Sequence, residues 1–174
     1  EAAEGEAKLS DEITSSKNFI NEYDAKGEAQ VVVGKKLLNR ELTEKEFSFT
    51  ISAIGDAPMR DADMKAYQAT ALTVKNGAPE GAEKIGPVSI PVFHYERGEA
   101  GSKFIYEITE NRITDPSVTQ NTTTGPAKIY AEVTVGADQG NGSLDAATIK
   151  YYKTYKAEAA EGEAKLSDEI TSSK

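Results

Sequence analysis

The two ends of the chain carry the same sequence. Residues 1–17 and residues 158–174 both read EAAEGEAKLSDEITSSK, without a single mismatch. Such a match indicates a tandem array of near-identical modules, because convergence would not preserve every exposed Glu and Ser. The repeating unit then spans residues 1–157, and the segment that follows Lys17 is expected to follow Lys174 as well. A linker added to both ends by cloning is the alternative, although the segment lacks the Gly-Ser monotony of engineered spacers.

Short alternating segments fill the chain between the two copies. Apolar and polar residues alternate with the period of two that is typical of half-buried β-strands. Turn residues such as Asn76-Gly77 separate the segments, while Pro87 and Pro91 mark one of them as an edge or irregular strand. No convincing amphipathic helix is present, so the pattern predicts an all-β, Ig-like sandwich of about seven or eight strands. The expected strands lie at residues 19–23, 31–37, 47–51, 72–74, 88–92, 104–110, 129–135 and 144–152.

Charge and composition exclude several classes of function. The 29 acidic and 20 basic side chains give a net charge of -9, which is unsuited to binding a phosphate backbone. The absence of cysteine excludes disulfides, thiolate metal sites and thiol catalysis. His94 is the only histidine, so neither a Ser-His pair nor a multi-histidine metal site is expected. No apolar run approaches the roughly 20 residues that span a bilayer. We therefore expect no cofactor, no metal, no nucleic-acid partner and no membrane insertion.

Three polar residues share the inward phase of their strands with apolar neighbours. They are Lys35, Glu110 and Asn21, and the neighbours are Val31 and Val33, Tyr106 and Ile108, and Phe19 and Tyr23, respectively. A polar group that is buried without a partner is strongly destabilising, so each residue needs a partner or contact with water. Long side chains at strand ends can reach solvent. An amine, a carboxyl and a carboxamide that all occupy inward positions favour a common site instead.

Four stretches of the sequence carry a family resemblance. They read GKKLLNREL from Gly34, EFSFTI from Glu46, FIYEITE from Phe104 and FINEY from Phe19. Together they resemble the streptococcal pilin isopeptide-linkage domain, the FctA-like family of Ig-like, CnaB-type pilin and adhesin modules. The resemblance covers residues 26–156 and adds the Phe19 stretch as the closing strand. It implies an Ig-like sandwich in which a covalent bond joins the first and last strands.

The resemblance also assigns roles to the three inward residues. In this family a Lys on the first strand and an Asn on the last strand form an amide with the help of a buried Glu, which implies a Lys35–Asn21 cross-link and Glu110 as the catalytic residue. The residue types suit the chemistry, because a lysine attacks only as the neutral amine, which an apolar pocket favours. A carboxyl in the same pocket can carry protons to the departing ammonia. Each molecule reacts once, so the chain is not expected to be an enzyme with turnover.

The order of these residues departs from the family. In a self-contained domain the Asn strand follows the Glu strand, whereas here Asn21 precedes Lys35. A parallel crossover usually takes a dozen or more residues, so a bond between the two within one chain would be strained. In a tandem array Asn21 would close the preceding module, and the Asn of this module would stand at the fourth position after Lys174. The closing strand is then displaced to the N-terminus, which invites strand exchange between chains.

A second alignment remains open at this point. It makes Tyr151–Tyr155 the closing strand and puts Lys153 where the Asn should be. A lysine cannot serve as the electrophile, so no cross-link would form in that arrangement. The two alignments thus differ in whether the module is covalently locked at all.

These observations divide the chain into four parts. Residues 1–17 are expected to be an inter-repeat linker, residues 18–25 the closing strand of the preceding repeat, residues 26–156 the sandwich, and residues 157–174 the linker into the next repeat. The linker could be a short helix or a solvated segment.

The expected function is that of a structural stalk module in an extracellular pilus or cell wall-attached Gram-positive surface protein. Its partners would be adjacent identical repeats or chains, joined by strand complementation. The covalent lock would resist tension and proteolysis, and the acidic surface suits a non-sticky spacer. The alternative is an adhesin module that recognises a host glycan or protein through its loops.

Overall fold

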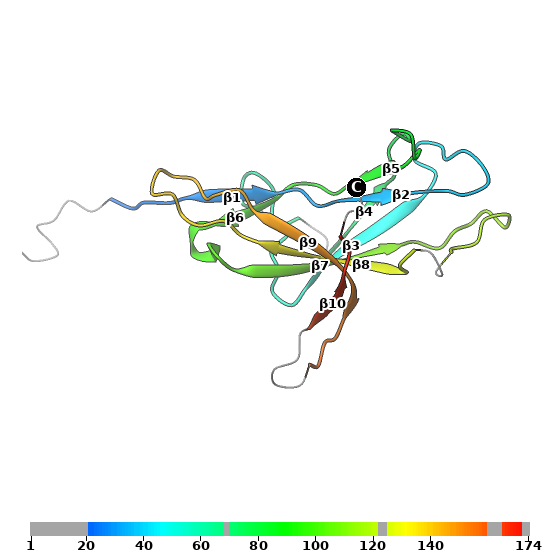
Figure 1. The fold of residues 1–174 in the computed structure, drawn as a ribbon. Helices are drawn as coiled ribbons and strands as arrows, with labels where there is room; N and C mark the ends of the chain where they lie inside the picture. The colour runs from blue at the N-terminus through cyan, green and yellow to red at the C-terminus, as the bar shows by residue number, and fades with distance from the viewer. Residues whose placement is uncertain (1–20, 68–69, 122–124, 160–164, 172–174) are drawn as a thin grey trace, which may run out of the picture.

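A computed structural model describes residues 21–67, 70–121, 125–159 and 165–171 (Figure 1). These residues form ten strands and one short 3-10 helix, which confirms the all-β prediction. The elements are β1 (Lys26–Ala29), β2 (Val32–Lys35), β3 (Ser48–Ile54), β4 (Ala71–Lys75), β5 (Gly86–Ser89), β6 (Phe93–Glu96), η2 (Arg97–Glu99), β7 (Lys103–Glu110), β8 (Lys128–Thr134), β9 (Thr148–Tyr155) and β10 (Leu166–Glu169). None of the described residues belongs to a helix that could cross a membrane.

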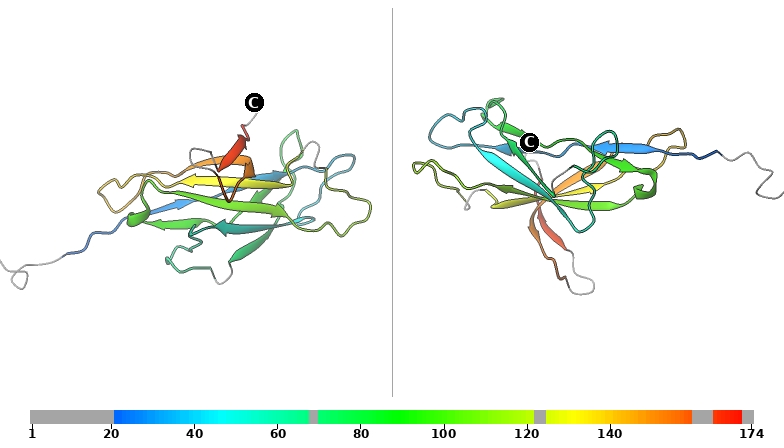
Figure 2. Two further views of the ribbon diagram at one scale, coloured as in Figure 1. Left: turned by 90° about the horizontal axis from the view of Figure 1, so that it is seen from below. Right: turned by 180° about the vertical axis from the view of Figure 1, so that it is seen from behind.

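The strands form the two layers of an Ig-like sandwich. One layer is a six-stranded antiparallel sheet in the order β10-β9-β8-β7-β3-β4. The other is a long two-stranded ribbon, in which β1 pairs with β6 and β2 pairs with β5. The Ile90 N–H donates to the Val31 carbonyl at 3.1 Å and joins the two halves of the ribbon. The second layer is therefore narrow, and within the described residues β2 has a strand on one side only (Figures 1 and 2).

Side chains from both layers meet in one core. The ribbon contributes the fully buried Val31, Val88, Ile90, Phe93 and Tyr95, and the large sheet contributes Ile51, Tyr106, Ile108, Ala131 and Val133. Phe93 stacks on Tyr106 with ring centroids 4.7 Å apart. The Tyr106 hydroxyl donates to the Pro58 carbonyl at 2.6 Å and lies 3.1 Å from the Tyr95 hydroxyl, so these buried groups are satisfied. Burial raises the pKa of Tyr95 to about 12, and both tyrosines remain neutral.

Most of the expected strands are present, and three others were not expected. The segments expected at 31–37, 47–51, 72–74, 88–92 and 104–110 overlap with β2, β3, β4, β5 and β7, and the expected hairpin strands at 129–135 and 144–152 overlap with β8 and β9. Strands β1 and β6 were missed. So was β10, which lies inside the segment expected to be a linker and pairs with β9 instead. Residues 21–25 form no strand, and the rest of the expected 19–23 strand lies outside the described residues.

Candidate functional site

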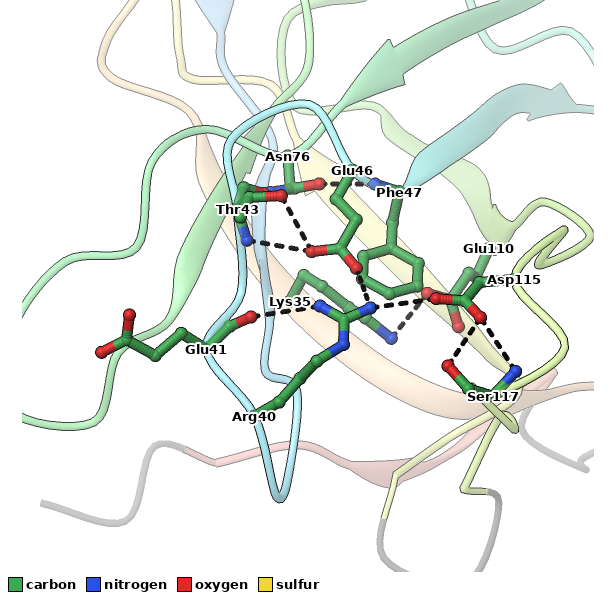
Figure 3. A network of polar contacts seen from close by, with 10 residues as sticks. All are labelled: Lys35, Arg40, Glu41, Thr43, Glu46, Phe47, Asn76, Glu110, Asp115 and Ser117. Atoms are coloured by element: carbon green, nitrogen blue, oxygen red, sulfur yellow. Dashed lines mark hydrogen bonds and ion pairs between the residues drawn. The ribbon is translucent and has the colours of Figure 1, made fainter.

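Lys35 and Glu110 meet at one end of the sandwich. Lys35 is the last residue of β2, and Glu110 is the last residue of β7 in the opposite layer. The Lys35 Nζ lies 2.6 Å from the Glu110 Oε1, and the two side chains are only 15% and 9% exposed (Figure 3). The same Nζ stands 4.3 Å from the centroid of the Phe47 ring, a cation–π contact. The two inward-facing side chains thus form an ion pair with each other and do not extend into solvent.

Strand register explains why these two residues meet. Along β2 the odd-numbered side chains turn inward, and the next residue, Lys36, points outward to an exposed ion pair with Glu83. Along β7 the inward positions run through buried Tyr106 and Ile108 to Glu110, as expected from the alternation. The pair therefore occupies the last inward position of each strand, where the apolar core ends.

The two oxygens of Glu110 have different surroundings. Oε1 is buried and faces the Lys35 amine, but no hydrogen-bond donor among the described residues is aimed at it. The contact with Lys35 is thus an ion pair without hydrogen-bond geometry. Oε2 accepts a hydrogen bond from the Gln120 Nε2 at 3.2 Å. The structure therefore leaves one buried carboxylate oxygen with unused acceptor capacity.

Gln120 is a contributor that the sequence gave no reason to single out. It lies in the loop between β7 and β8, is exposed, and belongs to a polar Thr- and Asn-rich stretch without alternation. The structure nevertheless places a primary carboxamide directly against Glu110. An amine, a carboxylate and a carboxamide accordingly lie together within the described part of the chain, although the carboxamide is not the expected Asn21.

A second polar network closes the end of the site beyond Lys35. Arg40 donates to Asp115 at 3.3 Å and also bonds Glu46, whose other oxygen accepts the Thr43 N–H at 2.9 Å (Figure 3). The hydrogen bond from Arg40 holds the pKa of Glu46 below its usual value. Hydrogen bonds from Ser117 lower the pKa of Asp115. This network ties the loop after β2 to the loop after β7.

A groove of about 820 Å³ lies between these loops. Lys35 and Gly34 line one wall, Ile108, Phe49 and Glu110 form the floor, and residues 117–121 and 125–129 form the other wall. Because the Val31 carbonyl bonds Ile90 on the β5 side, the backbone groups of Val32 point toward the opposite, open edge of β2. There the Val32 N–H donates to the Tyr151 hydroxyl at 3.2 Å, where a neighbouring strand would otherwise stand.

Asn21 lies at the opposite end of the molecule. It is exposed, and Figure 1 shows the described chain entering beyond the far end of β1. At about 3.3 Å per residue, the extended chain from Asn21 to Lys35 measures roughly 45 Å. The structure thus brings Lys35 and Glu110 together and does not bring Asn21 to them within one chain.

The second alignment, with Tyr151–Tyr155 as closing strand, does not fit the observed topology. These residues belong to β9, which pairs with β8 and β10 in the six-stranded sheet and not with β2. Lys153 therefore does not stand beside Lys35. Among the described residues, no group of three His, Asp or Glu side chains is placed to hold a metal ion.

Comparison with known proteins identifies the family. Residues 31–165 match the model of the FctA family, described as the Spy0128-like isopeptide containing domain. No curated protein and no solved structure matches the chain. The match covers most of the sequence, so the chain belongs to the FctA family and is a pilin-type structural domain of the CnaB-like β-sandwich class.

Proposed function

With membership of the FctA family as the premise, we propose that this chain is one module of a surface stalk, locked by an isopeptide bond between Lys35 and an Asn on a closing strand. The observation that carries the proposal is the buried Lys35–Glu110 pair facing a groove beside the open edge of β2. The closing strand has the sequence of residues 18–23, NFINEY, and comes from the next period or from a second copy of the chain.

The groove has the features that such a strand requires. The outward-pointing backbone groups of β2 offer hydrogen bonds to an added strand, as in other cases of strand complementation. Apolar floor residues, Ile108 and Phe49, suit the Phe side chain of the incoming segment, and the unused acceptor capacity of Glu110 suits a carboxamide N–H. Filling the groove would also widen the two-stranded layer to a third strand, removing an edge that invites aggregation.

The course of the C-terminal segment supports supply from the same chain. After β10 the Ile170 N–H donates to the Tyr151 carbonyl at 2.7 Å, and the hydroxyl of that tyrosine bonds β2 at Val32. The chain thus leaves the sheet beside the open edge of β2. Lys35 lies three residues farther along β2, about 10 Å away. The Asn of a following period would stand eight residues after Ile170, and eight extended residues reach roughly 26 Å, which leaves length for a turn.

Lys35 and Glu110 can carry the bond-forming step without a cofactor. Glu110 takes a proton from the Lys35 ammonium, and the neutral amine attacks the side-chain carbonyl carbon of the Asn. Glu110 then protonates the amide nitrogen, the carbon–nitrogen bond breaks, and ammonia leaves. The second proton of the amine returns to Glu110. The products are one amide, one ammonia and a protonated carboxyl, and the folded groove supplies the proximity that an unassisted amide exchange lacks.

The bond would give the module its mechanical role. It would join the first strand to the strand that leads into the next module, so tension would bypass the rest of the sandwich. It would also restrict the unfolded chain in the way that a disulfide does, with a stabilisation of about 2–5 kcal/mol.

The test is the intact denatured mass of the chain extended past Lys174 by the sequence of residues 18–25. We expect a monomer lighter by one ammonia, and no loss of mass in Lys35→Ala. When the added Asn that corresponds to Asn21 is replaced by Ala, no monomer lighter by one ammonia should form. The unextended chain should instead yield denaturation-resistant multimers that lack one ammonia per link. A folded extended chain of full mass would contradict the proposal.

A further inference from the structure

Tyr23 is fastened to the module at the end opposite to Lys35. Its hydroxyl donates to the Asp138 Oδ1 at 2.8 Å and accepts the Gly142 N–H at 3.0 Å. The Arg97 guanidinium stands 4.9 Å from the centroid of the tyrosine ring. We call these contacts of Tyr23 with Asp138, Gly142 and Arg97 the Tyr23 clamp. They join the entering chain to the β8–β9 hairpin and to η2, which are distant in sequence.

The groups that receive Tyr23 are themselves held in place. Asp138 accepts the Arg97 Nε–H at 2.8 Å and the Gly140 N–H at 2.9 Å, in addition to the Tyr23 hydroxyl. These contacts, led by the Gly140 N–H, lower the pKa of Asp138 to about 2 and keep it charged. Three donors converge on one carboxylate, so the clamp is preorganised by the fold.

The chain just after Tyr23 is fixed at further points. The Lys26 N–H donates to the Gly142 carbonyl at 3.3 Å, and the Leu144 N–H donates to the Lys26 carbonyl at 2.9 Å. At Gly27 an added Cβ would lie 2.9 Å from the Leu144 Cβ, so the backbone approaches the hairpin closely. Residues 23–27 therefore move with the module and not as a free tail.

Asn21 stands only two residues before Tyr23. Two residues of extended chain span at most about 7 Å. Under the proposed function Asn21 is bonded in the groove of the preceding module, while Tyr23 is held by this one. The same short segment then belongs to two modules at once.

We propose that the Tyr23 clamp is the joint between consecutive modules, and that it fixes their relative orientation. The inference rests on the proposed function and goes beyond it, because a covalent bond at Asn21 by itself would leave the two modules free to swivel. Tyr23 precedes β1 and Lys35 ends β2, so the two residues lie at opposite ends of the ribbon, whose course Figure 1 shows. Consecutive modules would therefore follow one another head to tail along the direction of that ribbon. Tension then passes from one cross-link through Asn21–Tyr23 into β1 of the next module.

The joint changes the role of the repeated segment. Leu166–Glu169, in the second copy, pairs with β9 as part of the module, so it is not a spacer between modules. The chain crosses from one module to the next at residues 21–25. A stalk built this way has almost no flexible linker.

The test uses a chain of two periods with a fluorescent dye on each module. In single-molecule transfer measurements we expect one narrow distance distribution for the unmodified chain. Tyr23→Phe at the junction removes the hydroxyl and keeps the ring beneath Arg97, and Arg97→Ala in the second module removes the cation. Both should broaden the distribution at least twofold, whereas the matched control Tyr155→Phe, outside the clamp, should not.

Hydrogen exchange on the same proteins supplies a local readout. We expect Tyr23→Phe to speed exchange of the Gly142 amide by about tenfold, because it loses its acceptor. Intact mass separates the two proposals. If the Tyr23→Phe and Arg97→Ala variants have lost ammonia but keep a narrow distance distribution, the proposed joint is wrong and the proposed cross-link is retained. A molecule of full mass would overturn the cross-link, and the joint would fall with it.

Discussion

The two ends of the β1–β2 ribbon both carry polar clusters, but only one of them is complete. At the Tyr23 end, a partly exposed carboxylate receives three hydrogen-bond donors from its own chain. At the Lys35 end, a largely buried carboxylate has an oxygen without a hydrogen-bond donor and faces an open groove. The first cluster is satisfied and holds structure in place. The second has only the Lys35 ammonium beside that oxygen, and its open groove can admit a further polar partner.

The two clusters also differ in how far they are exposed to water. Exposed ion pairs are screened by water and contribute little to the free energy of unfolding, so the main effect of the Tyr23 clamp is to fix the position of the entering chain. The Lys35–Glu110 pair is removed from water, where each charge depends on the other. Substitutions should therefore affect the two ends unequally.

The largest effect is expected from Glu110→Ala. It leaves the Lys35 ammonium in a pocket that is only 15% exposed, without its counter-ion. Removing one partner of a buried pair costs about 3–5 kcal/mol of the free energy of unfolding. Urea denaturation would measure this loss, and the cross-link should disappear as well.

The neighbouring carboxylate provides the control. Glu107 points to the other face of β7 and pairs with Lys128 at 2.9 Å, where Lys128 is 46% exposed. We expect Glu107→Ala to cost less than about 1 kcal/mol and to spare the cross-link. Equal losses for the two variants would show that the Lys35 end is no more dependent on its ion pair than the surface is.

An intermediate effect is expected from acid at the Tyr23 end. The Gly140 N–H, Arg97 and Tyr23 lower the pKa of Asp138 from 3.8 to about 2. A carboxyl with a lowered pKa stabilises the folded state above its unfolded value and loses this contribution as the pH falls through the folded value. The clamp should therefore persist at pH 4 and be lost as the pH approaches about 2. The nuclear magnetic resonance signals of the Tyr23 ring would report the change.

Asp138→Asn separates this titration from general acid unfolding. The variant has no charge to lose at this position, so the Tyr23 signals should not change between pH 4 and pH 2 by this route. If Asp138→Asn showed the same transition at the same pH as the unmodified protein, the transition would belong to another titrating group.

The smallest effect is expected from Gln120→Ala. Gln120 is exposed and contacts Glu110 through one hydrogen bond of 3.2 Å, so its loss should change stability by less than about 1 kcal/mol. The cross-link should still form in the extended chain, because the electrophile is the Asn of the closing strand. Loss of the cross-link in this variant would instead make Gln120 part of the reaction, and mapping of the linked peptides would identify the bonded residue.

The prediction from sequence was accurate where local periodicity decides the outcome. The inward phases of Lys35 and Glu110 follow from alternation within single strands, and the structure places both side chains inward. Strand β1 was missed because Gly27 and two charged residues leave it little apolar alternation. Strand β6 does alternate, with buried Phe93 and Tyr95 next to His94 and Glu96, but it is only four residues long. Strand β10 was missed because only one of its residues, Leu166, is apolar, and pairing with β9 overrides that composition.

The sequence by itself therefore determined the fold class, the family and the inward positions of a lysine and a glutamate. Only the tertiary structure decided that these two meet across the layers, that Gln120 approaches them, and that β2 keeps an open edge. It also placed Asn21 at the far end and joined Tyr23 to Asp138 across more than a hundred residues of sequence. The physical reason is that alternation fixes which face a side chain takes, whereas register and layer packing, set by contacts between distant strands, fix what that side chain meets.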